Sequence, residues 1–494
     1  MTDTTKEYAL EFPELPYEIW PTGQTVSKAG LGTYRMALGN DAQALALMKA
    51  IASGINLIDT STNYSLGASE SLIGEALKAL ENDVKRSDIV IITKIGYLQG
   101  PLLEQAKQRE KDGSPYPDMV KISDDVYHCI HPEFLKEQLR ESLNRMSTPY
   151  ADALLLHNPE YYFKDPELKK DMSLEEKRDA FYIRIKLAFS CMEDMVKEGK
   201  ISYYGISSNT FPFEFDHPEF CSAERCLEIA QELSDNHHFR VIQFPFNLVE
   251  PEAAISLNQE DESLTLIEFA KKHDLITLVN RPLNGVRNNQ LIRLSDTHSA
   301  QLPNTDELKK EIESISHASF SFAQKIEALG IEDQELKSIL VAHITAINAL
   351  QVQWNTYKSI DEWIKVRDEI LGKMANALTA INQLGNQSIL QWTINVAGLT
   401  TKIVNSIGSY YATIANEDFK RNGYIRTVIE KAFPKAFTDL PLSQAAFNAV
   451  RTVDGISSVL IGARSVEYVD DVLQALQMPV PEYDRADWLG MKLH

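Results

Sequence analysis

The stretch Asn56-Leu-Ile-Asp-Thr-Ser-Thr-Asn-Tyr-Ser-Leu-Gly-Ala-Ser-Glu-Ser-Leu-Ile-Gly-Glu-Ala-Leu-Lys78 decides the fold, because it contains a complete strand, loop and helix. Its apolar beginning predicts a buried strand that ends in Asp59, and the glycine-containing loop that follows carries Tyr64. Ser69 opens the amphipathic helix that we expect over 70–81. The acid at the strand end and the tyrosine on the loop above it are therefore expected at the same end of a sheet.

Short apolar runs alternate with amphipathic helical patterns along the chain, and eight such pairs are present. The predicted strands, most of them apolar on successive residues as in strands buried on both faces, are Gly30–Tyr34, Asn56–Thr60, Ile89–Lys94, Ala153–His157, Tyr203–Ser207, Val241–Phe244, Ile276–Asn280 and Val459–Gly462. The predicted helices lie at 42–53, 70–81, 133–146, 183–198, 222–235, 262–273, 442–452 and 466–476. This order favours an α/β fold of the closed (β/α)8 TIM barrel type over an open doubly wound sheet. A hairpin over 17–26 is expected to cover one end.

Three strand-to-helix connections are long, at 95–132, 158–182 and 281–441. All three leave from the C-terminal ends of strands, the face on which such barrels build their active sites. The longest has no proline between residues 304 and 433, in a chain that contains 20, and its apolar residues recur at helical spacing. It predicts an all-helical subdomain of three to five helices between strands seven and eight. A coiled-coil dimer arm is the alternative interpretation.

These features divide the chain into three parts. Residues 1–283 hold the N-terminal hairpin and barrel strands one to seven, residues 284–441 form the mostly helical insertion, and residues 442–494 hold the last barrel elements and the tail. Without its insertions the chain is close to the usual barrel size, so the length of 494 residues does not require a second enzyme.

Composition excludes several classes of partner. The formal net charge is −21, which opposes binding to nucleic acids and to anionic membranes. The four cysteines form no CxxC pair and do not alternate with histidines, so neither a disulfide framework nor a metal site is indicated. The chain also lacks an N-terminal targeting pattern and any 18-residue apolar run. We therefore expect a cytoplasmic protein without a metal, nucleic-acid or membrane partner.

Further motifs follow the other predicted strands. They are Thr93-Lys94, Leu155-Leu-His157, Tyr204-Gly-Ile-Ser207, Val241-Ile-Gln243, Asn280-Arg-Pro-Leu283 and Ile461-Gly-Ala-Arg-Ser465. Together with the stretch around Asp59, this set resembles the aldo-keto reductases over residues 1–283 and 442–478. The resemblance implies a (β/α)8 enzyme that transfers hydride between a nicotinamide cofactor and a carbonyl or alcohol substrate.

The resemblance also implies a catalytic group made of Asp59, Tyr64, Lys94 and His157, and the chemistry supports each role. A hydride transfer to a carbonyl needs a proton at the developing alkoxide, yet a phenol with a pKa near 10 is a poor acid or base near neutrality. A lysine ammonium beside the phenol stabilises the phenolate, and a carboxylate holds the lysine. Tyr64 is then the proton donor or acceptor, and His157 orients the carbonyl oxygen.

Cofactor contacts are implied at positions that match the family. The set comprises Thr33, Tyr34, Asp59, Ser207, Ser208, Asn209, Gln243, Asn280, Arg281, Leu283, Gly462, Arg464 and Ser465. Whether Ser208 or Asn209 contacts the nicotinamide amide is left open, as is whether Arg281 reaches the pyrophosphate or stacks on the ring. Free N–H groups after Gly462 suit a phosphate, and Arg464 suits a 2′-phosphate, so NADP(H) is slightly preferred over NAD(H).

The sequence is consistent with two functions. The first is an NAD(P)-dependent oxidoreductase acting on an aldehyde, a ketone or a sugar, with the insertion shaping the substrate cleft. The second is a nucleotide-binding redox sensor or scaffold with slow or no turnover, whose helical insertion recruits a partner. A homo-oligomer through that insertion is a further expectation. Turnover with a panel of carbonyl compounds separates the two functions.

Overall fold

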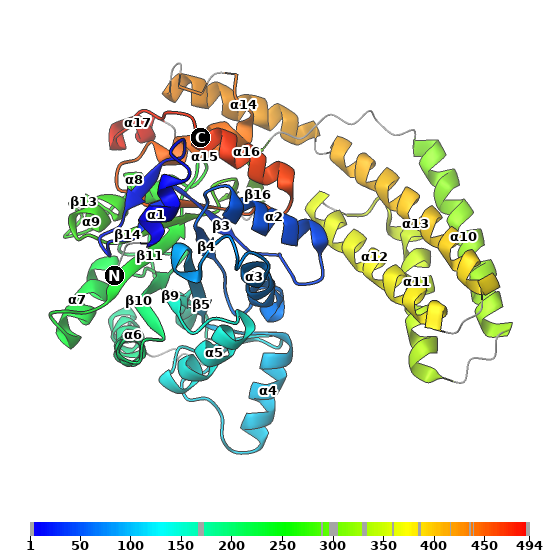
Figure 1. The fold of residues 1–494 in the computed structure, drawn as a ribbon, viewed down its shortest axis with the longest axis horizontal. Coiled ribbons are helices and arrows are strands. Elements are labelled where there is room, and N and C mark those ends of the chain that lie inside the picture. The colour runs from blue at the N-terminus through cyan, green and yellow to red at the C-terminus, as the bar shows by residue number, and fades with distance from the viewer. Residues whose placement is uncertain are drawn as a thin grey trace. The chain divides into compact units, whose positions relative to one another are not determined.

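Eight parallel strands close into a barrel, which confirms the predicted α/β fold class. The computed structural model describes residues 4–165, 172–287, 290–295, 305–328, 333–357, 360–383, 387–414, 416–433, 436–437 and 439–490. Around the barrel the strands run β3 (Ala29–Gly32), β4 (Leu57–Asp59), β5 (Val90–Ile95), β9 (Ala151–His157), β10 (Ile201–Ser207), β11 (Phe239–Pro245), β14 (Ile276–Asn280) and β17 (Ser458–Ile461). Each of the eight overlaps a predicted strand, and Figure 1 shows the helices around them.

The eight predicted barrel helices are also present. They are α2 (Asp41–Ala52), α3 (Ala68–Ala79), α5 (Pro132–Arg145), α6 (Leu174–Lys197), α7 (Ala223–Leu233), α9 (Leu266–Lys272), α15 (Leu442–Arg451) and α16 (Val466–Leu476). Two of these helices begin at a residue well away from the predicted one. Helix α6 begins at Leu174 rather than at 183, because Ser173 and Glu176 form a capping box there. Helix α9 begins at Leu266 rather than at 262, because Thr265 caps it in the same way.

The inside of the barrel is filled by apolar side chains from alternate positions of the strands. Residues facing inward include Leu57, Ile92, Leu155 and Val241, whereas neighbours such as Ile58 pack in the larger core between strands and helices. This alternation follows from the pleat of a strand, which turns successive side chains to opposite faces. It fixes which polar residues at the strand ends face the inside.

The N-terminal end of the barrel is closed by the predicted hairpin. Strand β1 (Tyr17–Ile19) pairs antiparallel with β2 (Thr25–Ser27). Trp20 and Val26 from this hairpin join the inner apolar cluster. Helix α1 (Thr4–Leu10), which the sequence analysis does not predict, precedes it and packs on β2.

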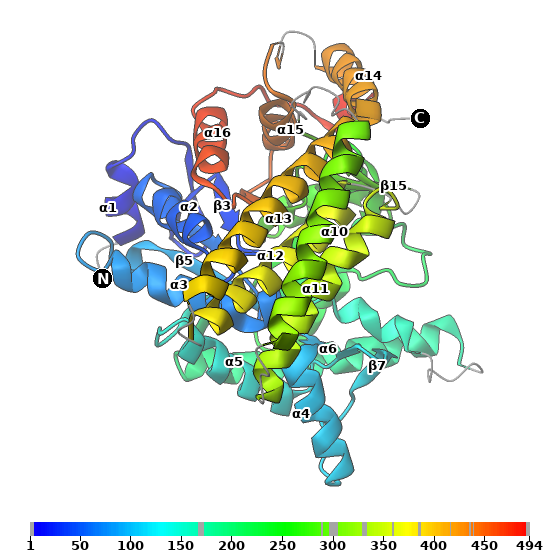
Figure 2. The ribbon, with the colours of Figure 1, turned by 90° about the vertical axis from the view of Figure 1, so that its right-hand side faces the viewer.

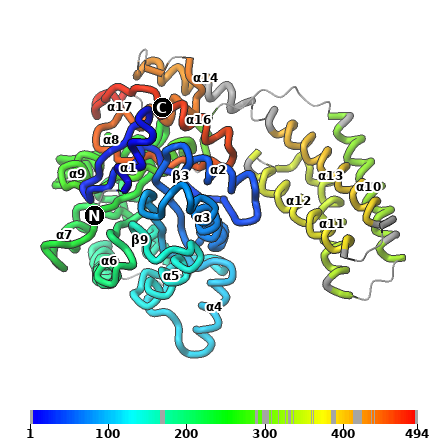
Figure 3. The backbone as a smooth tube through the Cα atoms, in the orientation of Figure 1, coloured from blue at the N-terminus to red at the C-terminus, as the bar shows by residue number. Residues whose placement is uncertain are grey.

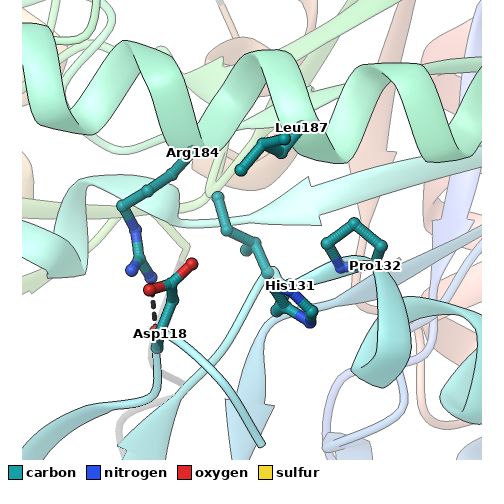
Figure 4. Close-up of a pocket in the computed structure, with 6 residues that line it drawn as sticks. Asp118, His131, Pro132, Arg184 and Leu187 are labelled. Carbon is teal, nitrogen blue, oxygen red and sulfur yellow. Dashed lines mark hydrogen bonds between the residues drawn. The ribbon is translucent and has the colours of Figure 1, made fainter.

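The connections add small elements of their own. They are β6 (Tyr97–Leu98), α4 (Gly100–Lys111), β7 (Val120–Ser123), β8 (Val126–His128), α8 (Glu252–Ile255), β12 (Leu257–Gln259), β13 (Leu264–Thr265), β15 (Asn284–Arg287), β16 (Gln290–Arg293), α17 (Arg485–Leu489) and 3-10 turns at Tyr64–Gly67, Arg86–Asp88 and Pro159–Lys164. Helix α6 holds the loop before β7 in place, because Arg184 Nη2 donates to the carbonyl of Asp118 over 2.8 Å, as Figure 4 shows.

A second compact unit covers Asp296–Tyr424, and the barrel unit comprises Met1–Ser295 and Ile425–His494. The helices of the second unit are α10 (Thr305–Ala328), α11 (Gln334–Gln353), α12 (Ile360–Gln383) and α13 (Gln387–Ile414). They are followed by α14 (Asn416–Ala432), which begins in this unit and ends in the barrel unit. Helices α10 and α12 each pack on both α11 and α13, so the four form a bundle, which Figures 2 and 3 show from two sides. The bundle has a hydrophobic core of its own, which includes Leu340, Trp363 and Ile407.

The end of α14 belongs to the barrel core. Ile425 and Ile429, with Phe433 beyond the helix, are buried in the same cluster as the barrel helices. Across the described residues, no helix is long and apolar enough to cross a membrane. Within the same residues, no three His, Cys, Asp or Glu side chains are grouped so that they could hold a metal ion.

We predict that Gly205→Ala destabilises the barrel. A Cβ atom at Gly205 would lie 1.8 Å from the carbonyl oxygen of Val241, at a shift in the register between β10 and β11. Because backbone must move, we expect the free energy of unfolding to fall by more than about 2 kcal/mol. Urea unfolding followed by tryptophan fluorescence measures it.

Gly32→Ala is the matched control on a neighbouring part of the barrel. The closest atom to its Cβ would be the carbonyl oxygen of Ile461 at 3.7 Å, an ordinary contact. We expect its effect to stay within about 1 kcal/mol. Equal stability of the two variants would contradict the prediction.

Candidate active site

Polar side chains form the top layer of the barrel interior, at the C-terminal ends of five neighbouring strands. They are Asp59 on β4, Lys94 on β5, His157 on β9, Ser207 on β10 and Gln243 on β11. Four of them stand two residues after an apolar residue of the inner cluster, so the strand pleat turns them inward as well. Ser207 pairs in register with both His157 and Gln243, which aligns the layer across the strands.

The ammonium group of Lys94 is the centre of this layer. Its side chain is 0% exposed, and its Nζ donates to Asp59 Oδ2 over 2.7 Å, to the carbonyl of Thr60 over 2.8 Å and to Tyr64 Oη over 3.2 Å. An ammonium has three hydrogens, so all of them are used. Because Tyr64 accepts a hydrogen bond from Lys94, its own hydroxyl hydrogen is left for another acceptor.

A chain of hydrogen bonds holds the carboxylate of Asp59. Gln243 Nε2 donates to Asp59 Oδ1 over 2.8 Å, and Ser207 Oγ donates to Gln243 Oε1 over 3.0 Å. On the other side, the backbone N–H and the hydroxyl of Thr33 both donate to the carbonyl of Asp59, at 2.9 and 3.2 Å. Both carboxylate oxygens therefore have partners, on β5 and β11, and the backbone of Asp59 is held by the residue that follows β3.

Tyr64 is placed by an unusual turn. It begins the 3-10 turn Tyr64–Gly67, in which Ser65 and Leu66 have positive φ values of 47° and 56°. Left-handed backbone is costly for side chains other than glycine, and such residues concentrate at functional sites. The phenol ring packs edge-on against Tyr34 at 5.3 Å and against His157 at 6.0 Å between ring centres.

Burial and the charges of neighbouring groups set the protonation states of Tyr64, Lys94 and His157. Burial raises the pKa of the Tyr64 phenol above its usual value, although Lys94 pulls it the other way. Burial by itself would lower the pKa of Lys94, but Asp59 and then Tyr64 outweigh it and raise that pKa. Burial, followed by the charge of Lys94 and the neighbouring His128, holds the pKa of His157 well below its usual value. Near neutrality the site thus holds a phenol, an ammonium and a neutral imidazole.

Several neighbours hold His157. Its Nδ1 lies 2.9 Å from Ser61 Oγ, and its backbone carbonyl lies 2.7 Å from His128 Nε2. The ring of Tyr97, from β6, packs edge-on against the imidazole at 4.8 Å. The insertion after β5 therefore contributes a wall to the site.

The predicted cofactor residues after β10 behave differently from one another. Ser208 is fully buried, and its hydroxyl pairs with Thr210 Oγ1 at 3.1 Å. Asn209 donates its backbone N–H to Glu160 Oε1 over 3.0 Å, while its half-buried side chain makes no hydrogen bond to the described residues. Tyr34 is 57% exposed. Of the two candidates left open by the sequence, Asn209 thus has the unused amide.

Two of the predicted cofactor residues at the end of β14 already have polar partners in the protein. Asn280 Nδ2 donates to Gln243 Oε1 over 3.5 Å, and its buried Oδ1 has no partner among the described residues. Arg281 has left-handed backbone with φ 55°, and its guanidinium pairs with Glu250 Oε1 at 2.7 Å. Leu283 packs on the edge of the barrel core.

The residues after β17 are open. Gly462 is exposed, and a Cβ there would meet nothing within 4 Å. Arg464 is half-buried and has no ion-pair partner among the described residues. Ser465 is the N-cap of α16, and its side chain does not cap the helix N–H groups. The carboxylate of Glu467 accepts hydrogen bonds from Ser465 and from its own backbone N–H, which lowers its pKa, so the start of α16 is partly engaged.

Three participants were missed by the sequence analysis. Ser61 stands two residues after Asp59, and the same alternation that turns Asp59 inward would have indicated it. Tyr97 and Glu160 lie on insertions, whose side-chain directions no periodicity predicts. Burial raises the pKa of Glu160 to about 7.

A family model and several known proteins match parts of this chain. The model of the aldo/keto reductase family matches residues 28–359 and ends before the last barrel strand. An uncharacterized oxidoreductase, YqkF, from Bacillus subtilis (strain 168) is 30% identical over 187 residues, 37% of this chain and 45% of that protein. The NADH-specific methylglyoxal reductase of Escherichia coli (strain K12) is 32% identical over 145 residues, 28% of this chain and 39% of that protein.

Two further proteins extend the comparison. The L-galactose dehydrogenase of Arabidopsis thaliana is 29% identical over 145 residues, 28% of this chain and 37% of that protein. The solved structure of the aldo-keto reductase AKR11C1 from Bacillus halodurans is 15% identical, covers 97% of each chain and has a TM-score of 0.46. The chain spans less than half of the length of each of the three curated relatives. Because the family model matches well over half of it, this chain belongs to the aldo/keto reductase family.

Proposed function

We propose that this protein is an NAD(P)-dependent oxidoreductase that interconverts a carbonyl compound and its alcohol, with Tyr64 as the general acid and base. The observation that carries the proposal is the hydrogen-bonded series Asp59, Lys94 and Tyr64 inside the barrel mouth. Lys94 donates to the phenol oxygen, so the phenol hydrogen is available to a substrate oxygen. Family membership supports the class of reaction.

The residues around the site fit a nicotinamide cofactor. The buried Oδ1 of Asn280 has no partner among the residues that the structure describes, and a carboxamide N–H group would satisfy it. Asn209 offers a side-chain amide on the next-but-one strand end. The start of α16 and Arg464, which has no ion-pair partner among the described residues, would hold phosphate groups if the Glu467 side chain moves away from the helix start. When bound, such a cofactor supplies or accepts the hydride.

In the reducing direction, Tyr64 donates its hydroxyl hydrogen to the substrate oxygen. Lys94 stabilises the phenolate that this leaves, and Asp59 keeps Lys94 charged and in place. His157 donates a second hydrogen bond to the same substrate oxygen and so favours the developing negative charge. In the oxidising direction, the phenolate takes the hydroxyl proton back.

The substrate class follows from the reaction and from the relatives. One relative is named as a methylglyoxal reductase and another as an L-galactose dehydrogenase, so small aldehydes, ketones and sugars form the panel to test. NADP(H) is preferred over NAD(H) in this proposal because Arg464, without an ion-pair partner in the described part of the chain, suits a 2′-phosphate. The helical unit Asp296–Tyr424 is proposed to select the substrate or to join a second copy of the chain.

Tyr64→Phe tests the proposed function. Removing the hydroxyl leaves the ring contacts and abolishes the proton donor, so kcat for carbonyl reduction should fall by about 10²- to 10⁴-fold. Consumption of NAD(P)H with the carbonyl panel measures it. Tyr203→Phe is the matched control, because the Tyr203 hydroxyl donates to the carbonyl of Thr22 near the opposite end of the barrel. Tight cofactor binding without turnover in the unaltered protein would instead favour the nucleotide sensor.

The pH profile of reduction should be flat on both sides of neutrality. Tyr64 keeps its proton, because its pKa is raised above the usual value, and His157 stays neutral, because its pKa is well below the usual value. We expect kcat at saturating substrate to be constant from about pH 6 to about pH 9 and to fall only where the phenol ionises. A transition centred near pH 6.5 that persists in Glu160→Gln would contradict this assignment of protonation states, because burial raises the pKa of the Glu160 carboxyl to about 7.

Arg464→Ala should separate the two cofactors. The guanidinium is proposed to pair with a 2′-phosphate, which only NADP(H) carries, so the Kd for NADPH should rise about tenfold. The Kd for NADH should change less than about twofold. Fluorescence titration with each cofactor measures both constants, and equal losses for the two would remove Arg464 from the 2′-phosphate site.

A further inference from the structure

Ser61 is a fully buried serine whose hydroxyl lies against the candidate catalytic histidine. Its Oγ is 2.9 Å from Nδ1 of His157. The imidazole is neutral near pH 7, so it carries one hydrogen, on either Nδ1 or Nε2. The hydrogen bond made by one ring nitrogen decides which nitrogen is protonated. The hydrogen bond with Ser61 can therefore decide which ring nitrogen of His157 carries the hydrogen when a substrate binds.

The Ser61 hydroxyl has one hydrogen and three neighbours that could accept it. Besides His157 Nδ1, these are the carbonyl of Lys94 at 3.1 Å and Asn63 Oδ1 at 2.7 Å. The Lys94 carbonyl already accepts from the backbone N–H of Thr62 at 3.1 Å and from Thr62 Oγ1 at 3.2 Å. Two donors fill its two lone pairs, so it does not need the Ser61 hydrogen.

The side chain of Asn63 can serve as a donor to Ser61. Its amide lies between Ser61 Oγ and Gln99 Oε1, which is 3.2 Å from Asn63 Nδ2. Turning both half-buried amides by 180° exchanges groups of the same shape and reverses the direction of each hydrogen bond. Gln99 then donates to Asn63, Asn63 donates to Ser61 Oγ, and the Ser61 hydrogen points at His157.

We propose that Ser61 is a positioning residue that donates to His157 Nδ1 and thereby keeps the catalytic hydrogen of His157 on Nε2. It ends a hydrogen-bond chain that runs from Gln99 through Asn63 to Ser61 and His157. All donors point toward the site, so each bond polarises the next. The inference rests on the proposed function, because it matters to catalysis only where His157 donates to a substrate oxygen.

The tautomer has a direct chemical consequence. A carbonyl oxygen and the alkoxide that forms from it only accept hydrogen bonds. With the hydrogen on Nε2, His157 donates to that oxygen as its charge develops. With the hydrogen on Nδ1, the Nε2 lone pair faces the oxygen and repels it. No described residue hydrogen-bonds Nε2, which leaves this nitrogen for a substrate.

Nitrogen NMR of the ¹⁵N-histidine-labelled full-length protein tests the proposal without any substrate. A protonated and a bare imidazole nitrogen have well-separated shifts, and the signals of His157 are identified by their loss in His157→Gln. We expect a bare Nδ1 and a protonated Nε2 at pH 7. Ser61→Ala should move both shifts toward the average of the two tautomers, because neither nitrogen is then constrained. A protonated Nδ1 in the unaltered protein would overturn the proposal.

Kinetics test the consequence. Ser61→Ala should lower kcat for carbonyl reduction about tenfold, less than the loss of about 10²-fold expected for removing the donor His157 itself. The Kd for the cofactor should stay the same, and Ser61→Thr, which keeps the hydroxyl, should restore most of kcat. Ser458→Ala is the matched control, because it removes a fully buried serine hydroxyl that donates to the carbonyl of Ser27 and does not touch His157.

The outcomes separate this proposal from the proposed function. If the unaltered protein reduces no carbonyl compound, the proposed function fails, while the nitrogen shifts still report the tautomer. If it turns over and Ser61→Ala changes neither the shifts nor kcat, the proposal for Ser61 fails and the function stands. If Ser61→Ala and Ser458→Ala lower kcat equally, Ser61 acts only by packing, which also overturns the proposal.

Discussion

The ion pair between Lys94 and Asp59 inside the barrel is the interaction on which the site depends. A buried ammonium without partners costs several kcal/mol, and it would lose its proton instead. Here it has three acceptors, one of which is the carboxylate. The cost of burial is offset only while Asp59 keeps its place. The hydrogen bonds from Gln243 on β11 and from Thr33, directly after β3, therefore support the charge of Lys94 indirectly.

Barrel closure is the condition for that arrangement. Asp59, Lys94 and Gln243 meet because β4, β5 and β11 curve around one axis and present the same layer inward. Apolar side chains such as Leu57 and Val241 fill the layer beneath, which excludes water from below. The polar layer is thus shielded from water on the side of the apolar layer and accessible on the side of the barrel mouth. That asymmetry lets Tyr64 keep a raised pKa and still offer its hydrogen to a substrate.

Barrel closure also explains why the chain can carry long insertions. The strand ends that bear Asp59 and Lys94 are held by the barrel, and the loops above them are free to vary. The β6 element brings Tyr97 against His157, while Asp296–Tyr424 folds around a separate core. Local patterns predicted the strands and most helices well. They missed α1, and they placed the start of α6 too late, because the apolar periodicity of α6 is weaker than its capping signal.

The sequence by itself determined the order of strands and helices, because these patterns depend on neighbours close in the chain. The candidate group Asp59, Tyr64, Lys94 and His157 was implied by the resemblance of its motifs to a known family. Only the tertiary structure decided that Ser61 contacts His157 and that Arg281 pairs with Glu250. It also decided that Ser208 pairs with Thr210, whereas the Asn209 amide makes no hydrogen bond to the described residues. Such contacts depend on strand register and on turn geometry, because a shift of one residue would turn each side chain to the opposite face of the sheet.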